Sequence, residues 1–416
     1  MRQDKAKDVQ SSRVTYETLE GFVREKAQGF IQDILEEEVS LFLGREKSER
    51  FPGRVDTPKG YRNGYGKPRK LSLMNGTVKI RRPRVRGTEE NFESKVLPFF
   101  KRKSKEVGEL LPELYLHGLS KGDFELALRN LLGDGAPLSP SSIQRLKGKW
   151  QMEYEEWKKR DLSALEVVYL WADGIYVKAG LEKDKAALLV VIGSLSNGNK
   201  VVLACESGYR ESKESWSEVL RNLKSQGLRY PRLTIADGHL GMWAALRDIY
   251  PESDEQRCWN HKIMNVLDAL PKRVRPQAKE LLSKIPYAPT KGKCEKLRDQ
   301  FTKRFEKDYG GATKKLLNDW ERMVTFYSFP KEHWVHLRTT NIVESPFNAI
   351  RLRTNVVRRY KKVESATAMI WKLMQVAQKN FRILKGAWLL PDVYSGKTFI
   401  DGIHIKNNLK IERKAA

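Results

Sequence analysis

Three carboxylate residues in three different local settings constrain the fold of this chain more than any other feature. Asp173 and Asp237 each follow an apolar run rich in β-branched residues, which is typical of a buried strand. Glu344 opens a stretch with helical apolar spacing. Because residues far apart in a sequence can meet at one edge of a sheet, we expect these three to lie together in an α/β domain.

Such a cluster suits divalent metals and phosphate chemistry. Mg²⁺ prefers oxygen ligands in near-octahedral geometry, and two ions about 4 Å apart stabilise the attacking and leaving oxygens of a phosphodiester. The layout is that of a nuclease with two metal ions per active site. We therefore expect Asp173, Asp237 and Glu344 to be catalytic and metal-binding, with Mg²⁺ as the cofactor and Mn²⁺ as a substitute.

Each acid also has a purely structural explanation. The Asp-Gly pairs that begin at Asp173 and Asp237 are compatible with a hairpin turn and with a loop before a helix N-cap. Asn341 and Glu344 have the spacing of a capping box. These explanations do not predict one another, so the joint occurrence of the three settings favours a chemical role.

The spacing of the acids predicts the architecture. Asp173 and Asp237 are 64 residues apart (237 − 173), whereas Asp237 and Glu344 are 107 apart (344 − 237). The second interval exceeds what a compact core needs, so it indicates an inserted subdomain, and residues 256–336 have a charged, helical pattern.

The order of elements around the first two acids indicates the fold. Apolar runs at 167–172, 186–193 and 201–205 precede a helical pattern from about Lys213 and another apolar run at 233–236. This β-β-β-α-β order is the opening of a ribonuclease H-like fold. A long helix is expected over 341–383.

Charge points to a polyanionic partner. The chain has 78 Lys and Arg against 52 Asp and Glu, a formal charge of +26. Such a field attracts nucleic acid, although a basic ribosome-associated protein has the same signature. No long apolar run and no signal peptide are present, so we expect a cytoplasmic, nucleoid-associated protein without membrane contact or nucleotide cofactor. Three cysteines and no Cys-x-x-Cys exclude a disulfide framework and a Cys-rich zinc finger.

The N-terminal region has three predicted features. Residues 17–43 form an amphipathic helix, which either packs on its own domain or dimerises. Residues 59–86 contain ten Lys or Arg and no acid, and their Asn75-Gly76 predicts a basic β-hairpin, or else a solvated charge run. Three helical patterns over 104–159 are compatible with a helix-turn-helix DNA reader, the last helix starting at Pro140.

Candidate DNA contacts follow from these features and from the basic stretch after Glu344, which we expect to continue one helix through Lys362. The alternative for that stretch is a solvated helix face. The candidates are Arg81, Arg82 and Arg84 in the hairpin, Gln144, Arg145 and Lys147 in the last helix, and Arg338, Arg351, Arg353, Arg358 and Arg359 near Glu344. Trp259, Trp320 and Trp334 are candidates for stacking on a base, with core packing as the alternative.

Six strings resemble a known family. WADGIYVK, GYRESKESW, ADGHLGMWAALR, EQRCWNHKIMNVL, HWVHLRTTNIVES and RLRT occur in the order found in the Mutator-type transposases of bacterial insertion sequences, the insertion sequence 256 family. The resemblance covers residues 60–385 and is strongest over 165–360. It implies a catalytic Asp-Asp-Glu set at Asp173, Asp237 and Glu344, and an auxiliary Cys-x-x-His pair at Cys258 and His261.

The resemblance also bears on zinc. Cys258, His261, His333 and His336 have spacings compatible with a Cys-His₃ site. The two pairs belong to separate family motifs, however, and zinc is not the metal of this chemistry. We therefore expect Cys258 to pack beside the active centre and His261 to contact DNA or an acid.

The function implied is a DDE transposase that binds terminal inverted repeats, cleaves DNA at the element ends and transfers the 3′-hydroxyl ends to target DNA. It would act on double-stranded DNA as a homodimer with two Mg²⁺ ions per active site. The alternatives are a structure-selective nuclease or resolvase on the same fold, and a domesticated DNA-binding protein without catalysis. The expected regions are an N-terminal helical region (1–58), a basic hairpin region (59–103), a helix-turn-helix-like region (104–160), the first part of the core (161–255), a helical insertion (256–336), the final core region (337–390) and a loosely held basic tail (391–416).

Overall fold

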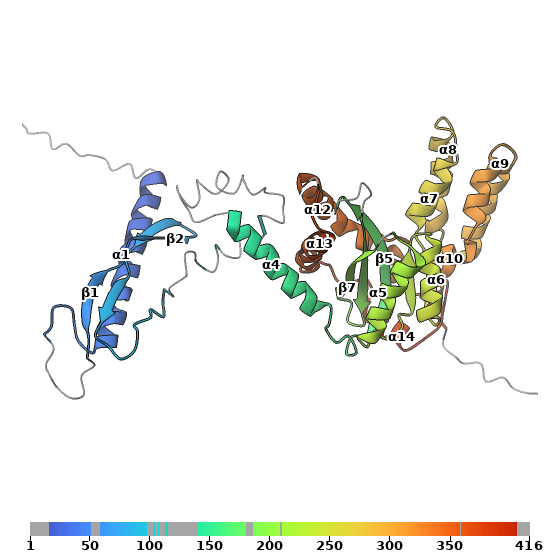
Figure 1. Cartoon of the computed structure of the whole chain (residues 1–416). Helices are drawn as coiled ribbons and strands as arrows, with labels where there is room; N and C mark the ends of the chain where they lie inside the picture. Colours follow the sequence, from blue (N-terminus) through green and yellow to red (C-terminus); the bar gives the residue numbers. More distant parts are fainter. Residues whose placement is uncertain are drawn as a thin grey trace, which may run out of the picture. The chain divides into compact units, whose positions relative to one another are not determined.

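The computed structural model describes residues 16–50, 59–97, 104, 107, 113–114, 140–179, 186–208, 210–357 and 359–405. The chain forms two compact units, residues 1–146 and 147–416 (Figure 1). Most of the expected helix-turn-helix, residues 105–139, lies outside the described residues apart from 107, 113 and 114. Its last helix is present as α4, Pro140–Trp157.

The first unit pairs one long helix with two small hairpins. Helix α1, Tyr16–Leu43, buries Leu35 against the sheet of β2, Arg69–Leu73, and β3, Gly76–Ile80. The expected hairpin is confirmed, but its two-residue turn is 74–75, because Leu73 already pairs with Gly76. Strands β1, Tyr61–Tyr65, and β4, Pro83–Arg86, form a second antiparallel pair.

The second unit is built on a five-stranded mixed sheet of order β7-β6-β5-β8-β9. Strand β6 is antiparallel to its neighbours β5 and β7, whereas β5, β8 and β9 run parallel. The strands are β5 Val167–Val177, β6 Ala186–Leu195, β7 Lys200–Gly208, β8 Leu233–Ala236 and β9 Asp254–Arg257. The four strands predicted from apolar runs are present, and β9 is an additional one.

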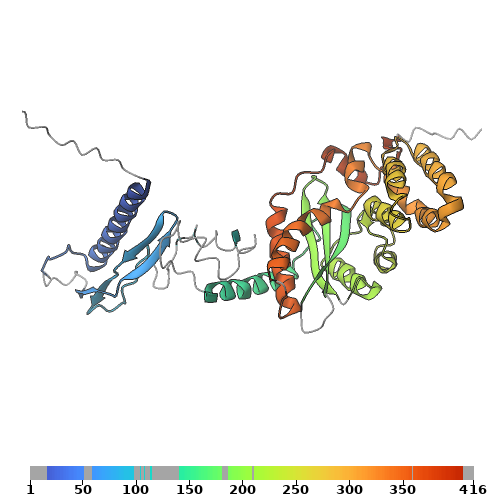
Figure 2. The same cartoon turned by 90° about the horizontal axis from the view of Figure 1, so that it is seen from above.

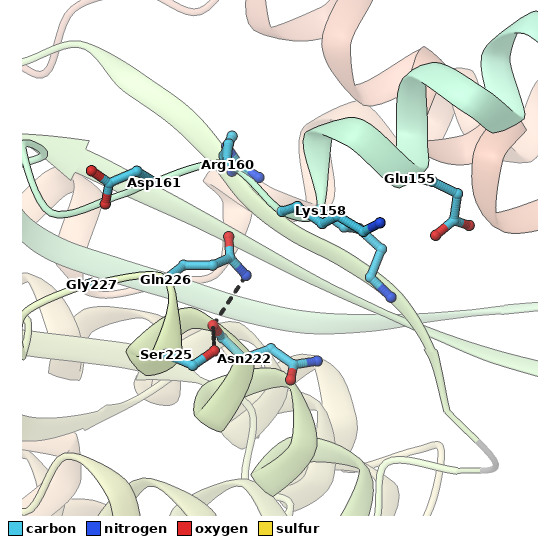
Figure 3. Close-up of a pocket in the computed structure, with 9 residues that line it drawn as sticks. Glu155, Lys158, Arg160, Asp161, Asn222, Ser225, Gln226 and Gly227 are labelled. Carbon is cyan, nitrogen blue, oxygen red and sulfur yellow. Dashed lines mark hydrogen bonds between the residues drawn. The ribbon is translucent and has the colours of Figure 1, made fainter.

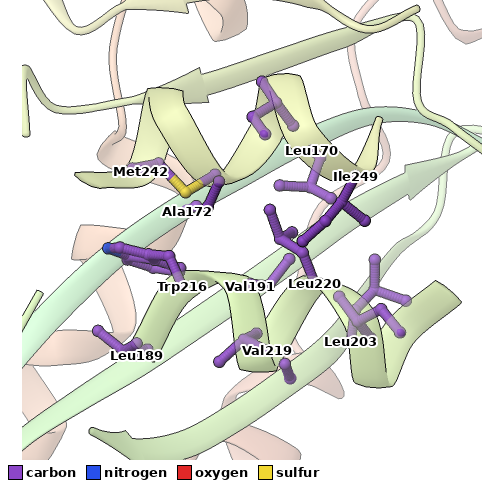
Figure 4. Close-up of a cluster of buried hydrophobic side chains, with 14 of the residues drawn as sticks. Leu170, Ala172, Leu189, Val191, Leu203, Trp216, Val219, Leu220, Met242 and Ile249 are labelled. Atoms are coloured by element: carbon purple, nitrogen blue, oxygen red, sulfur yellow. The ribbon is translucent and has the colours of Figure 1, made fainter. Parts of the chain in front are cut away.

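Helices cover both faces of this sheet (Figure 2). On one face, α5, Lys213–Ser225, and α6, Leu240–Ile249, bury a large apolar cluster that includes Leu170, Trp216 and Met242 (Figure 4). Ser212 caps α5, its hydroxyl accepting the Ser215 N–H. Helices α12 and α13 contact strands β5, β6 and β7 from the other face. The sheet is therefore the rigid middle layer on which the acids are placed.

The segment between β9 and α12 is helical, as expected. It begins at α7, which follows β9 directly, and returns to the sheet through α11. Its elements are α7 Trp259–Asp268, α8 Arg275–Lys284, η1 Ile285–Tyr287, α9 Lys291–Leu317, α10 Trp320–Val324, η2 Thr325–Ser328, η3 Lys331–His333 and α11 Trp334–Leu337.

The C-terminal part differs from expectation in two ways. The expected long helix is two helices, α12, Asn341–Val357, and α13, Val363–Gln378, so the helix of Glu344 carries Arg351 and Arg353 but does not continue through Lys362. Tyr360 between them forms a β-bridge with Ala179, which breaks the helical path. The remaining elements are η4 Ala387–Leu389, α14 Leu390–Tyr394, β10 Phe399–Ile400 and β11 Ile403–His404.

The tail is not loosely held over its described residues, which end at 405. The backbone N–H of Gly402 donates to Tyr327 O, and the Asp401 carboxylate accepts the N–H of Lys291 at 2.6 Å. Arg232 donates to the Tyr394 carbonyl from two nitrogens. Residues 391–405 are thus fixed to the helical segment and the sheet.

Candidate active site

Sheet register brings the two aspartates together. Strands β5 and β8 are parallel neighbours in which Ala172 pairs with Ala236, so Asp173 and Asp237 are the next residues of adjacent chains. Asp173 does not end its strand as expected, because β5 continues to Val177. This excludes a hairpin turn there. Asp237 does follow the last residue of β8.

Side-chain alternation sets the face on which they lie. Ala172 and Ala236 belong to the core under α5 and α6, so their successors point to the opposite face. That is the face that α12 contacts, and Glu344 stands in the first turn of α12. The fold therefore brings all three predicted acids to one region of the sheet.

The Thr340 hydroxyl orients Glu344. It donates to the Glu344 carboxylate, and the Thr340 carbonyl accepts the Glu344 N–H at 3.0 Å. The Asn341 side chain instead accepts a hydrogen bond from Asn260. The structure thus contains no capping box between Asn341 and Glu344, because the Glu344 carboxylate is bonded to Thr340.

His261 lies between the acids. Its Nδ1 is 3.8 Å from Asp237 Oδ1 and 3.9 Å from Glu344 Oε1. It is placed by the first turn of α7, which begins directly after Cys258. The contact with acids is one of the two outcomes expected for His261.

Burial and nearby charges shift the pKa values of Asp173 and His261. Burial raises the pKa of Asp173 to about 7, with the Glu344 and Glu211 charges adding to the rise while the Gly174 N–H and His261 oppose it. Contact with the Cys258 side chain, together with Asp237 and Asp173, raises the pKa of His261 to about 9 despite its burial. At neutral pH, His261 is therefore a cation beside the carboxylates.

Sequence reasoning did not single out Glu211. Its side chain is 8% exposed, and a Cβ added to Gly174 would lie 2.5 Å from its Oε1, so its carboxylate covers the glycine that follows Asp173. His239 Nε2 lies 3.8 Å from the other oxygen. The only available signal was its position in the family string GYRESKESW.

The four-ligand zinc arrangement is wrong. The His333 ring is hydrogen-bonded through Nδ1 to Tyr169 and through Nε2 to the Gly386 carbonyl. His336 Nε2 accepts the N–H of Lys385. Both histidines serve the fold and are therefore not available to Cys258 and His261.

Cys258 packs beside the acids as expected. It is fully buried, its sulfur accepts the Thr340 N–H at 3.4 Å, and that sulfur lies 3.2 Å from the Thr340 hydroxyl oxygen. Among the described residues, one group of metal-ligating atoms is compact, with Cys258, His261 and Glu344 donors all within 4.8 Å of one another. The three predicted acids do not form such a group by themselves.

The tryptophan candidates are core residues. Trp259, Trp320 and Trp334 are 1%, 7% and 2% exposed, which leaves no ring face for a base. The indole N–H of Trp259 donates to the Met323 carbonyl, and that of Trp334 to Phe329. The ordinary packing explanation was correct.

Two arginine candidates near Glu344 are also part of the fold. Arg353 is 2% exposed, and the Arg338 guanidinium lies over the rings of Tyr287, Phe326 and Trp334. Arg351 and Arg359 are exposed, whereas Arg358 lies outside the described residues.

The hairpin candidates likewise include one arginine that is engaged within the fold and two that are exposed. Arg82 donates to the Leu97 carbonyl and is partly buried, whereas Arg81 and Arg84 are exposed. Lys70 and Lys79, which prediction did not single out, are exposed and directly opposite each other on β2 and β3. Like charges directly opposite each other repel, so a counter-charge on this face would be stabilising.

The last-helix candidates all lie in α4. Gln144 and Arg145 are exposed and Lys147 is partly buried.

A separate pocket of about 640 Å³ lies where α4 ends beside the C-terminus of α5 (Figure 3). Two of its three cations already have partners within the fold. Arg160 donates to the Val202 and Leu203 carbonyls, and Lys158 pairs with Glu206 at 3.6 Å. The pocket does not compete with the acid cluster as a functional site.

Comparison with known proteins now identifies the family. The family model described as "Transposase, Mutator family" matches residues 2–383 of this chain. A transposase for insertion sequence element IS6120 of Mycolicibacterium smegmatis is 43% identical over 296 residues, covering 71% of this chain and 92% of that protein. A transposase for element IST2 of Acidithiobacillus ferrooxidans is 37% identical over 292 residues, covering 70% and 99%.

Among solved structures, the Drosophila P element transposase strand transfer complex aligns with this protein at 14% sequence identity and a TM-score of 0.30. The alignment covers 69% of this chain and 84% of the chain in that complex. A TM-score this low is too weak to support an inference about fold or function. The sequence matches define the class, an enzyme of the transposase type. The chain belongs to the Mutator family of transposases. Within the described residues, no helix is both long and apolar enough to cross a bilayer.

Proposed function

We propose that this transposase cleaves DNA at the ends of an insertion sequence and joins the 3′-hydroxyl ends to target DNA, using Asp173, Asp237 and Glu344. The observation that carries the proposal is the parallel register of β5 and β8, which puts two aspartates side by side under the helix of Glu344. A ribonuclease H-like core is supported by the strand order, in which β6 is antiparallel to its neighbours and the strands of both aspartates are adjacent.

The donor set fits Mg²⁺ in chemistry. Asp173 carries a raised pKa because burial leaves its charge poorly compensated, and a divalent cation would supply that compensation. Asp173, Asp237 and Glu344 would hold two Mg²⁺ ions, which when bound stabilise charge on the attacking and leaving oxygens. His261 supplies one positive charge between two of these acids, so it lowers their mutual repulsion.

Arg351 is positioned to hold a phosphate near the acids. It lies seven residues after Glu344 on α12, which is two helical turns along the same face, about 10 Å away. Its side chain is exposed. A cation there would fix the DNA backbone without reading its sequence.

Metal binding should depend on pH through Asp173. Its carboxyl group must lose its proton to bind Mg²⁺, and burial raises its pKa to about 7. We expect apparent Mg²⁺ affinity in the cleavage assay to fall about tenfold per pH unit below 7 and to level off above it. The titration should be repeated with Glu211→Gln. Because the Glu211 charge raises the pKa of Asp173, its loss should lower the pH below which Mg²⁺ affinity falls. A flat profile between pH 6 and 8 in both proteins would contradict this assignment.

The hairpin is proposed as a surface for the DNA backbone. Lys79→Gln should reduce the slope of log affinity against log salt by about 0.9, the value for one phosphate contact. It should also leave the fold equally or slightly more stable, since it relieves the repulsion with Lys70. Lys95→Gln removes another exposed charge from the same unit and is the control. Equal slopes for the two variants would show that Lys79 of the hairpin does not contact a DNA phosphate.

Recognition of terminal repeats is proposed for α4. Gln144 and Arg145 are exposed near its N-terminus and have the side chains that read adenine and guanine edges.

The homodimer is proposed to form through α1. At 100° per residue, Leu19, Phe22, Val23, Phe30 and Leu41 form one exposed stripe, opposite the face that buries Leu35. Exposed apolar stripes of this length mark interfaces. Lys26 and Glu37 lie within the stripe, and an antiparallel second copy would set each Lys26 against the Glu37 of the other copy.

The double variant Phe22→Asp, Phe30→Asp should therefore sediment as a monomer at concentrations where the unaltered chain is a dimer. Both rings are more than half exposed, so the fold should survive the change. Ile400→Asp, at an equally exposed apolar residue of the second unit, should leave the mass unchanged. An unaltered dimer in the double variant would place the interface elsewhere.

A further inference from the structure

The side of the acid cluster formed by α7 has ligand chemistry unlike that of a magnesium site. Cys258, His261 and Glu344 present a sulfur, an imidazole nitrogen and a carboxylate oxygen, all within 4.8 Å of one another. Asp237 Oδ1, which accepts the Gly238 N–H, is 3.8 Å from His261 Nδ1 and lies beside this group as the nearest fourth oxygen donor to the imidazole. Thiolate and imidazole select Zn²⁺ over Mg²⁺, which takes oxygen ligands.

The fold preorganises these donors. Cys258 is fixed as the residue before α7, His261 lies one turn later on the same helix, and Glu344 is held by Thr340. The Thr340 backbone N–H donates to the Cys258 sulfur, so one residue orients two of the ligands. His261 Nδ1 is buried and makes no hydrogen bond to any residue that the structure describes.

We propose that Cys258, His261 and Glu344, with Asp237, form a Zn²⁺ site that overlaps the catalytic carboxylates and inhibits the enzyme when filled. On zinc binding, the Cys258 thiol and the His261 imidazolium each release a proton to solvent, and the sulfur and the imidazole nitrogen each take one coordination position. When zinc fills this site, the Glu344 carboxylate coordinates zinc and is no longer available to bind magnesium. This inhibitory role rests on the proposed function, whereas the zinc site itself does not.

Binding is tested without DNA, using Co²⁺ as a spectroscopic substitute for zinc in the full-length protein. The expected result is an intense sulfur-to-cobalt charge-transfer band at one equivalent of Co²⁺, abolished by one equivalent of Zn²⁺. Cys258→Ser should abolish the band, while Cys205→Ser and Cys294→Ser, which alter the other two buried cysteines, should retain it. A missing band in the unaltered protein, or one that persists in Cys258→Ser, overturns the proposal.

A second variant guards against a folding defect in Cys258→Ser. Glu344→Gln alters a partly exposed side chain and should keep the sulfur band but weaken Co²⁺ and Zn²⁺ affinity at least tenfold, because one charged ligand is lost. Unchanged affinity in Glu344→Gln would separate the sulfur site from the catalytic acids and end the inhibition proposal. Since the readout is spectroscopic, an enzyme that fails to join DNA would leave this result unaffected.

In the cleavage assay, low concentrations of Zn²⁺ should inhibit despite excess Mg²⁺. Activity that stays constant while the cobalt assay shows the site filled would also overturn the inhibitory role.

Discussion

Asp173→Asn, Asp237→Asn and Glu344→Gln should each reduce DNA cleavage and strand transfer by on the order of 10³-fold or more. Each change removes one negative ligand charge while keeping the side-chain shape. In Asp173→Asn the amide oxygen can still accept the Gly174 N–H that the carboxylate accepts at 2.8 Å. Both activities are measured on one end duplex, alongside binding.

Binding of the end duplex should persist in all three variants, because the basic surfaces are unchanged and one repelling charge is gone. Asp268→Asn is the matched control, since its carboxylate is exposed at the far end of α7 and should be dispensable. Any one variant that cleaves at the wild-type rate would remove its residue from the catalytic set.

Replacing Mg²⁺ by Ca²⁺ should have the second largest effect. Ca²⁺ takes six to eight oxygens at longer distances in a loose geometry, so it should occupy the carboxylates without supporting chemistry. We expect cleavage to fall by on the order of 10³-fold while DNA binding persists, and Mn²⁺ to restore activity.

The experiment begins with protein stripped by a chelator, to which each cation is added back in parallel. Binding is followed under the same Ca²⁺ conditions, so that lost chemistry is distinguished from lost DNA contact. Cleavage that proceeds in the chelator, or equally well in Ca²⁺, would rule out a magnesium site.

The central sheet could be predicted because its strands are buried on both faces. The runs that became β5, β6 and β7 are apolar since helices cover them from both sides. Strand β9 escaped prediction because its sequence, DEQR, is polar. Its polar side chains pair with residues distant in sequence, such as Arg257 with Asp319 at 3.0 Å, and no local pattern reveals such pairs.

Family strings mark all three acids in the sequence, whereas a strand end marks only Asp237, because Asp173 lies inside β5 and Glu344 lies on α12. The roles of nearby residues were harder to predict, since they depend on contacts between distant segments. Arg353 and Arg338 were chosen as DNA contacts, yet Arg353 is buried and the Arg338 guanidinium lies over aromatic rings of the helical segment. Glu211 was missed because its approach to Gly174 exists only in the folded sheet.

The most direct test of the account supplies the purified protein with an end duplex that already carries a free 3′-hydroxyl, a target duplex and Mg²⁺. We expect a joined product that requires Mg²⁺ or Mn²⁺ and that is lost in Asp173→Asn, Asp237→Asn and Glu344→Gln. Cutting without joining would instead identify a nuclease or resolvase. Binding with neither reaction would identify a DNA-binding protein without catalysis, and either result would contradict the account.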